Sequence, residues 1–311
     1  MSSERHLKII SIPEGLESER ADTAISRILG LSRSTVVALI DAGEVTRHGK
    51  AISKSEKVGQ GEVIEVLMPE SKREVVATPT PVPGLEIIYN DDDIVVINKP
   101  AGVASHPSPG WHGPTVVGAL MAGGFTITTT GAQERQGVVH RLDVGTTGLM
   151  VLAKNEHSYS GLKDQFRMRT VEKIYHALVQ GHMDPSEGTI DAPIDRHPRD
   201  DYRFAVVADG KPSITHYTTL EFFAACSLLE VELETGRTHQ IRVHFSALHH
   251  PLVGDITYGA DHTLAAKLSI SRPWLHAKKL ALLHPSTGER MEFVTDYPAE
   301  LKASLELLRG S

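Results

Sequence analysis

The sequence predicts an α+β protein of two unequal domains. Apolar residues at helical spacing occur in a few short stretches, whereas apolar runs typical of strands recur after residue 85 and pair as hairpins. Residues 69–84 separate the two regions and carry Pro79, Pro81 and Pro83, which exclude a helix or a central strand and favour a stiff, extended linker. We therefore expect a small α/β domain at residues 1–75 and a larger domain at residues 85–311.

The core of the small domain is predicted at residues 20–67. A first amphipathic helix ends at Gly30, and a second helix covers about Ser34–Gly43. Residues 45–52 have the pattern of a tight hairpin, and a last strand follows at Glu62–Leu67. The apolar face of the first helix is expected to consist of Ala21, Ala24, Ile25, Ile28 and Leu29.

Composition limits the classes of protein that this chain can belong to. The 39 acidic and 32 basic side chains give a formal net charge of −7. Because phosphate binding needs Lys and Arg that face the phosphates, any nucleic-acid interface has to be a local basic face. The single cysteine, Cys226, excludes an intrachain disulfide framework and a zinc site of the CxxC type.

The chain carries no pattern of a membrane protein. No run approaches the roughly 18 apolar residues of a membrane span, and Met1–Arg20 is too polar for a signal peptide. We therefore expect a cytoplasmic protein with no membrane partner. The 17 histidines raise the alternative of a metal-dependent hydrolase. No HExxH pair occurs, and His239 and His244 are not spaced to share a helix face, so no metal site is predicted.

The most informative stretch is Val138–Leu152. Two short apolar runs flank a polar segment, and this pattern predicts two strands joined by a loop. Buried strands hold such a loop still, and Gly145 and Gly148 let a backbone or a ligand come close. Asp143 is therefore a candidate nucleophile or base. The alternative is a structural ion pair between Arg141 and Asp143 at a strand end.

This stretch resembles the signature of a known family. His140-Arg141-Leu142-Asp143 followed by Thr146-Thr147-Gly148 is similar to the signature of the RluA family of pseudouridine synthases. Thr147 departs from the serine that many members carry, but it retains the hydroxyl. Lys99, in the segment that resembles the first family motif, is either a phosphate contact or a structural residue. The other segments that match family motifs, in the family's order, are Asn98–Gly102, Lys173–Val179 and Gly236–Arg242.

The resemblance implies both a fold and a set of site residues. The larger domain is expected to be a pseudouridine synthase domain with a mainly antiparallel mixed sheet flanked by helices and loops. Asp143, Tyr175 and Arg242 are the implied catalytic residues, with Arg242 paired to Asp143 and Tyr175 packed against the target base. Arg141 is implied to enter the gap that a flipped nucleotide leaves. Composition alone also allows Tyr175 to be a buried sheet tyrosine.

The helix that carries Arg242 is predicted from its local pattern. Thr238 is its expected N-cap. Arg242 is expected outside the buried face, in a position to reach sideways toward a carboxylate. That predicted buried face consists of Ile241, His244, Phe245 and Leu248.

The small domain has a resemblance of its own. Leu31-Ser32-Arg33-Ser34 and Val45–Lys50 are similar to segments of the S4-type RNA-binding domain. Arg33, Arg47 and Lys50 lie in the turns after the two helices, where they are candidates for contacts with an RNA backbone. For each of them the alternative is a solvated side chain without an RNA contact.

The implied function is the isomerisation of specific uridines to pseudouridine. The reaction exchanges a C1′–N1 bond for a C1′–C5 bond without redox change, so no cofactor is expected. Asp143 either attacks C1′ or removes the C2′ proton, and the sequence leaves both open. The expected partner is the 23S ribosomal RNA of the large subunit, free or in a pre-ribosomal particle, and the expected state is a monomer. The alternatives are a pseudouridine synthase for tRNA and a non-catalytic RNA-binding ribosome-assembly factor.

Overall fold

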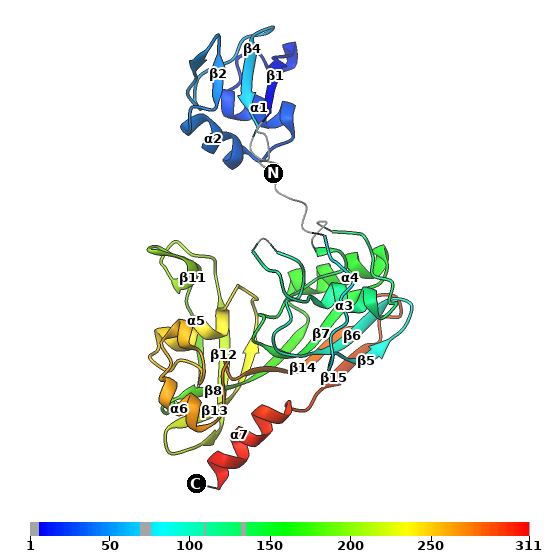
Figure 1. Cartoon of the computed structure of the whole chain (residues 1–311), viewed down its shortest axis with the longest axis vertical. Coiled ribbons are helices and arrows are strands. Elements are labelled where there is room, and N and C mark those ends of the chain that lie inside the picture. The colour runs from blue at the N-terminus through cyan, green and yellow to red at the C-terminus, as the bar shows by residue number, and fades with distance from the viewer. Residues whose placement is uncertain (1–5, 69–75, 109, 132–134, 311) are drawn as a thin grey trace. The chain divides into compact units, whose positions relative to one another are not determined.

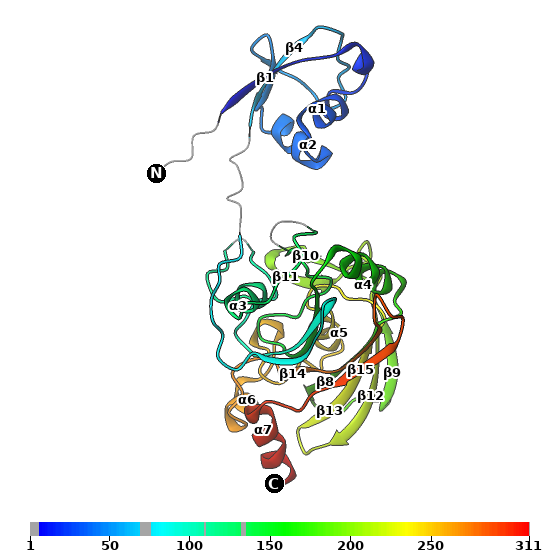
Figure 2. The same ribbon diagram turned by 90° about the vertical axis from the view of Figure 1, so that its right-hand side faces the viewer.

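The chain divides into two compact units, Met1–Glu74 and Val75–Ser311. The computed structural model describes residues 6–68, 76–108, 110–131 and 135–310 (Figures 1 and 2). Residues 69–75 of the predicted linker lie outside the described residues. Its C-terminal part belongs to the second unit, because Val82 packs against the core of that unit and the Thr80 N–H donates to the carbonyl oxygen of Gly118 at 3.0 Å.

The first unit is a four-stranded antiparallel sheet covered by two helices. The predicted helices are confirmed as α1 (Ala21–Leu29) and α2 (Arg33–Asp41), and Ser32 caps α2 by accepting the Thr35 N–H. The helices bury Ala24, Ile25 and Val36 in a separate hydrophobic core. The strands, in sheet order, are β1 (Leu7–Ser11), β4 (Val63–Leu67), β2 (Val45–Arg47) and β3 (Lys50–Ala51).

Strand β1 was not predicted from the sequence. Its side chains at Leu7 and Ile9 are exposed, and only Ile10 is buried. An edge strand with a single buried position lacks the alternation of apolar and polar residues by which strands are recognised. The first unit therefore begins before residue 20, the start of its predicted core.

The second unit is built on a nine-stranded sheet, and the prediction of a mainly antiparallel mixed sheet is confirmed. The strand pair β7 and β14 is parallel, and the other neighbours run antiparallel. The order is β5 (Glu86–Asn90), β6 (Ile94–Lys99), β7 (Thr147–Ala153), β14 (Leu275–Leu283), β8 (Glu172–Gln180), β13 (Cys226–Leu233), β12 (Ile214–Phe222) and β9 (Glu187–Asp191), with β15 (Arg290–Val294) paired to β14.

Helices and a small hairpin complete the second unit. Figure 1 shows α5 and α6 near the β12 and β13 part of the sheet, and α3 and α4 near β6 and β7. A separate two-stranded hairpin, β10–β11, packs against α5. The bounds are α3 (Val116–Ala122), α4 (Glu156–Met168), β10 (Ile194–His197), β11 (Asp200–Val206), α5 (Gln240–Ala247), α6 (His262–Lys267), α7 (Ala299–Arg309) and the 3₁₀ turn η3 (Ile256–Tyr258).

One predicted strand of the central stretch is absent from the described residues. Val138 forms only an isolated bridge to Leu152, so the prediction of a strand before Asp143 was wrong. The strand after the loop is confirmed as β7, which is buried along its whole length. Two apolar residues before the loop are too few to extend the pairing beyond one bridge.

Gly148 is required by the close approach of β7 to β14. Its φ is +111°, and a Cβ at this position would lie 2.3 Å from the carbonyl oxygen of Ala277. Neither the left-handed backbone nor the contact leaves space for a side chain. Two strands of the central sheet can therefore run side by side only with glycine here.

Gly148→Ala is predicted to destabilise the second unit by about 3 kcal/mol, because it adds a backbone clash to an unfavourable φ. Gly288→Ala is the matched control, since Gly288 has a φ of +71° but no atom within 4 Å of a built Cβ, and it should cost about 1 kcal/mol. Urea unfolding followed by tryptophan fluorescence measures both, because Trp111 and Trp274 lie in the second unit. Equal losses in the two variants would contradict the steric argument.

Candidate active site

Side chains from other segments hold the loop that carries Asp143. The Ser105 hydroxyl donates to the carbonyl oxygen of Leu142 at 2.8 Å and accepts the N–H of the same residue at 2.9 Å. Arg272 donates from Nη1 to the carbonyl oxygen of Gly145 at 2.8 Å. The backbone on both sides of Asp143 is thus fixed, as a reacting side chain requires.

Lys99 supports the same loop from inside the protein. Its side chain is fully buried, and its ammonium donates to the carbonyl oxygens of Pro100, Val103 and Val144 at 3.0, 2.9 and 3.4 Å. Burial lowers the pKa of Lys99 to about 7, and the charge of Asp143 opposes this shift. Of the two roles considered for Lys99, the structural one fits this burial and a phosphate contact does not.

Arg242 and Asp143 are brought together by the fold. Arg242 Nη1 donates to Asp143 Oδ2 at 3.3 Å. The rest of the guanidinium is held by Asp255, because Nε and Nη2 donate to its two oxygens at 2.6 and 2.9 Å. Asp255 is 1% exposed. Sequence reasoning did not single out Asp255 as a site residue, although Asp255 ends the segment His250–Asp255, which continues the resemblance to the family.

Two details of the prediction for α5 were wrong. His239, with a left-handed φ of 58°, occupies the N-cap position that was predicted for Thr238. Arg242 is 8% exposed and thus buried, whereas Leu248 is 41% exposed. Because Asp255 neutralises the guanidinium inside the protein, an arginine can occupy a face that apolar patterning alone would exclude.

Tyr175 lines the same pocket as Asp143 and Arg242. It projects from β8 and is 7% exposed. Burial, and after it the charge of Asp143, raises the pKa of the Tyr175 hydroxyl, which is therefore protonated at neutral pH. The pocket thus combines a carboxylate, a guanidinium and an aromatic ring, and its rim includes the exposed side chain of Arg141.

A second hollow adjoins this pocket and shares Arg141, Tyr175 and Arg237 with it. Several of its basic residues have acidic neighbours. Arg169 pairs with Glu234 at 3.3 Å and Arg167 with Asp164, and the buried Lys173 interacts with the charges of Glu232 and Glu234. Among the residues that line this hollow the cations still outnumber the carboxylates, so the hollow is a local basic face on an acidic chain. We call it the basic cleft, and its basic residues are Arg135, Arg141, Arg167, Arg169, Lys173 and Arg237.

The candidate RNA contacts of the first unit differ in their surroundings. Arg33 pairs with the buried Asp22 at 2.9 Å, and the pKa of that carboxyl is lowered by Arg20 first and then by Arg33. Arg47 pairs with Glu62 at 2.9 Å and with a second carboxylate, that of Glu56. Lys50 is exposed on β3. Two of the three predicted contacts thus also link parts of their own unit.

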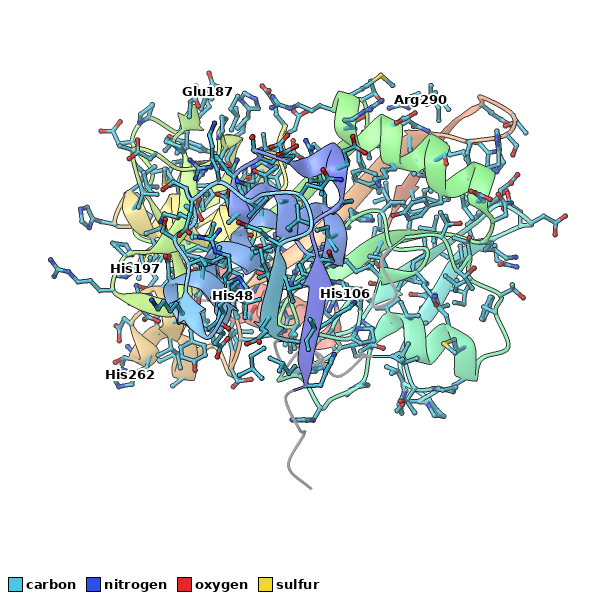
Figure 3. The ribbon with its side chains drawn as sticks, turned by 90° about the horizontal axis from the view of Figure 1, so that it is seen from above. His48, His106, Glu187, His197, His262 and Arg290 are labelled. Carbon is cyan, nitrogen blue, oxygen red and sulfur yellow. The ribbon has the colours of Figure 1, made fainter. Side chains whose placement is uncertain are left out.

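The histidines do not gather into a metal site in the described part of the chain. Within residues 6–68, 76–108, 110–131 and 135–310, no group of three or more His, Cys, Asp or Glu residues is placed to hold a metal ion. Figure 3 labels His106, His197 and His262 on three different segments of the second unit. In the same described ranges, no helix has the length and apolar character needed to cross a membrane.

Comparisons with known proteins agree with this geometry. A family model described as RNA pseudouridylate synthase matches residues 93–247. An uncharacterized RNA pseudouridine synthase of Mycobacterium bovis is 54% identical over 96% of this chain and 97% of its own. The ribosomal large subunit pseudouridine synthase D of Nitrosomonas europaea is 39% identical over 97% of this chain and 88% of its own. The solved structure of human RNA pseudouridylate synthase domain containing 1 is 29% identical, covers 75% of this chain and 98% of its own, and has a TM-score of 0.58.

The chain therefore belongs to the RNA pseudouridylate synthase family. It is an RNA pseudouridine synthase, an isomerase, with the mixed-sheet fold of that family. The alternatives of a metal-dependent hydrolase and of a non-catalytic assembly factor are thereby set aside.

His276 lies opposite Thr147, which follows the loop that carries Asp143, and it is fully buried. Its Nδ1 is 2.8 Å from the hydroxyl of Thr147, the residue at which many family members carry serine, so this hydroxyl has a structural role. Burial first, and then Lys278 and Arg272, lowers the pKa of His276 to about 3. The folded protein therefore holds a neutral imidazole here, whereas the unfolded chain takes up a proton near pH 6.5.

This difference predicts an acid-sensitive fold. Between pH 6.5 and the folded pKa the unfolded state binds more protons, so stability falls as pH falls, by about 2 kcal/mol at pH 5 for His276. His276→Asn keeps a polar atom near Thr147 but does not titrate, so its stability should change less between pH 7 and pH 5. Urea unfolding at both pH values measures this. The same pH dependence in both proteins would contradict the assignment.

Proposed function

We propose that this enzyme converts uridines of large-subunit ribosomal RNA to pseudouridine, and that Asp143 is the carboxylate that acts on the ribose. The observation that supports the role of Asp143 is its contact with the buried Arg242 in the pocket that Tyr175 lines. The ribosomal target rests on relatives such as the Nitrosomonas enzyme, whose name states a large-subunit function.

The reaction sets the demands on these residues. The C1′–N1 bond breaks, a C1′–C5 bond forms, and a proton leaves C5 while N1 gains one. No electrons are exchanged, so the proposal includes no cofactor. Asp143 either attacks C1′ or removes the C2′ proton, and in both routes one of its oxygens has to meet the sugar. Arg242 orients the carboxylate through the contact of its Nη1 with Oδ2.

The flipped nucleotide is placed by Tyr175 and Arg141 in this proposal. The ring of Tyr175 stacks on uracil, a contact worth about 1–3 kcal/mol, and its protonated hydroxyl adds no charge to the pocket. Arg141, exposed at the rim, fills the gap that the nucleotide leaves in the RNA. The basic cleft holds the neighbouring phosphates.

The first unit is proposed to be an S4-type RNA-binding domain that increases affinity for the target. Support comes from the similarity of residues 31–34 and 45–50 to that domain and from the exposure of Lys50. We propose a monomer, because Asp143, Tyr175 and Arg242 line one pocket without a residue from a second copy. A cytoplasmic location is part of the same proposal and follows from the proposed ribosomal target.

Tritium release tests the reaction and the target together. RNA labelled at C5 of uridine should release tritium with the wild-type protein when it is large-subunit ribosomal RNA, and less when it is tRNA. Asp143→Asn should lower the rate by at least about 10⁴-fold while RNA binding persists, because the amide neither attacks nor takes a proton. Retained turnover in Asp143→Asn would mean that another residue reacts. Faster tritium release from tRNA than from ribosomal RNA would mean that tRNA is the target.

Substitutions in the first unit separate RNA contact from stability. Lys50→Ala should weaken RNA binding and lower the slope of log affinity against log salt by about 1, because one phosphate contact is lost. Lys8→Ala is the matched control, since Lys8 is exposed on β1 at the opposite edge of the same sheet. Filter binding at several salt concentrations measures both. Equal slopes for Lys50→Ala and the wild type would argue against an RNA contact at this position.

A further inference from the structure

His239 lies beside Asp143, and the proposal above gives it no role. Its Nε2 is 3.7 Å from Asp143 Oδ2, the oxygen that also accepts the Nη1–H of Arg242 at 3.3 Å. No side chain in the described part of the protein donates to the other oxygen, Oδ1. The two groups that contact this carboxylate therefore share one oxygen and leave the second one open.

The opposite side of the His239 ring is fixed by a tyrosine. The Nδ1 atom is 2.9 Å from the Tyr258 hydroxyl, and that hydroxyl accepts the backbone N–H of Phe204 at 3.1 Å. Tyr258 is 4% exposed, so its own hydrogen needs an acceptor inside the protein. His239 Nδ1 is the acceptor within reach, and the neutral ring then carries its hydrogen on Nε2.

The other neutral tautomer is unfavourable at both ends of the ring. It would direct the Nε2 lone pair at the oxygen of Asp143, and it would leave the Tyr258 hydroxyl hydrogen without an acceptor among the described residues. The ring cannot turn away easily, because Tyr258 and Phe204 pack edge-on against it, each with 5.7 Å between ring centroids. Hydrogen bonding and packing therefore define one orientation.

The backbone conformation and the charge state of His239 are consistent with a neutral ring held in this one orientation. Its φ of 58° lies in the left-handed region, where residues other than glycine are uncommon and histidine is one of the types that occur more often. Although it stands at the N-cap of α5, its side chain makes no capping hydrogen bond. Burial lowers the pKa of His239. The charges of Asp143 and Asp255 oppose this shift, whereas those of Arg242 and Arg141 add to it. The ring is therefore neutral at pH 7.

We infer that His239 is a positioning residue that directs a neutral Nε2–H at Asp143 Oδ2, so that Oδ1 is the oxygen that meets the ribose. This inference rests on the proposed role of Asp143. The distance of 3.7 Å is longer than a hydrogen bond, and contacts of catalytic groups are often long before the substrate binds. A neutral donor orients the carboxylate without adding a second positive charge, which would make Asp143 a weaker nucleophile or base.

Nuclear magnetic resonance of the full-length protein with ¹⁵N-labelled histidine tests the tautomer without any assay of activity. The ring signals of His239, assigned by their loss in His239→Asn, should show a hydrogen on Nε2 and none on Nδ1. Tyr258→Phe removes the hydroxyl but keeps the ring, and it should allow the Nδ1–H form to appear. A wild-type ring with its hydrogen on Nδ1 would overturn the inference.

Three variants then test positioning in single-turnover tritium release at saturating RNA. His239→Gln places an amide N–H where Nε2 lies and should stay within about threefold of the wild-type rate, whereas His239→Asn is too short and should lose about tenfold. Asparagine tolerates the left-handed backbone, so this variant should fold. His262→Asn is the control, because His262 is exposed on α6 (Figure 3), and it should leave the rate unchanged.

RNA affinity separates positioning from a general structural role. Both His239 variants should bind RNA within about twofold of the wild type, since the lost contact acts on Asp143 and not on RNA. Equal rate losses in the Gln and Asn variants, or losses that follow RNA affinity, would overturn the inference. Turnover by Asp143→Asn would refute the role of Asp143 instead, and it would leave the measured tautomer unaffected.

Discussion

The buried ion pair between Arg242 and Asp255 is the interaction on which the geometry of the site depends. Removing two charges from water costs several kcal/mol for each ion, and only close, well-directed hydrogen bonds offset that cost. Both oxygens of Asp255 are used, at 2.6 and 2.9 Å, and the ring of Tyr258 lies 4.8 Å from the guanidinium carbon. With Nε and Nη2 fixed in this way, Nη1 has one direction left, which is toward Asp143. The orientation of the proposed reacting carboxylate is thus set by a residue that never meets the substrate.

The mixed sheet explains why distant segments meet at this place. Ala277 of β14 lies opposite Gly148 of β7 on one side and opposite Tyr175 of β8 on the other. The loop with Asp143 enters β7 and Arg272 precedes β14, so the parallel pairing of these strands brings both to the same end of the sheet. An antiparallel pairing of β7 with β14 would have put the loop and Arg272 at opposite ends. The one parallel pair among the described strands is therefore the part of the topology that assembles the site.

The features that were predictable from the sequence are those with a local or a family signature. Helix α1 has its apolar spacing and a glycine at its end, and Asp143 and Arg242 lie in segments that resemble family motifs. Asp255 and His239 also lie in segments that resemble the family, but they were not singled out as site residues, because their contacts with Arg242 and Asp143 form only in the folded chain. Strand β1 and the hairpin β10–β11 were not predicted either, since edge strands bury few side chains. The basic cleft draws on residues from position 135 to position 237, and no count of charges along the chain can show that they converge.

The basic cleft has a consequence for how RNA finds this enzyme. The whole chain carries a formal charge of −7, so a polyanion is repelled by much of the protein and attracted where the cleft opens. Encounters in wrong orientations are then short-lived, and discrimination among RNA molecules begins during diffusion, before any nucleotide leaves its stack. An acidic protein therefore binds RNA that is not its target more weakly than a protein with a uniformly basic surface would.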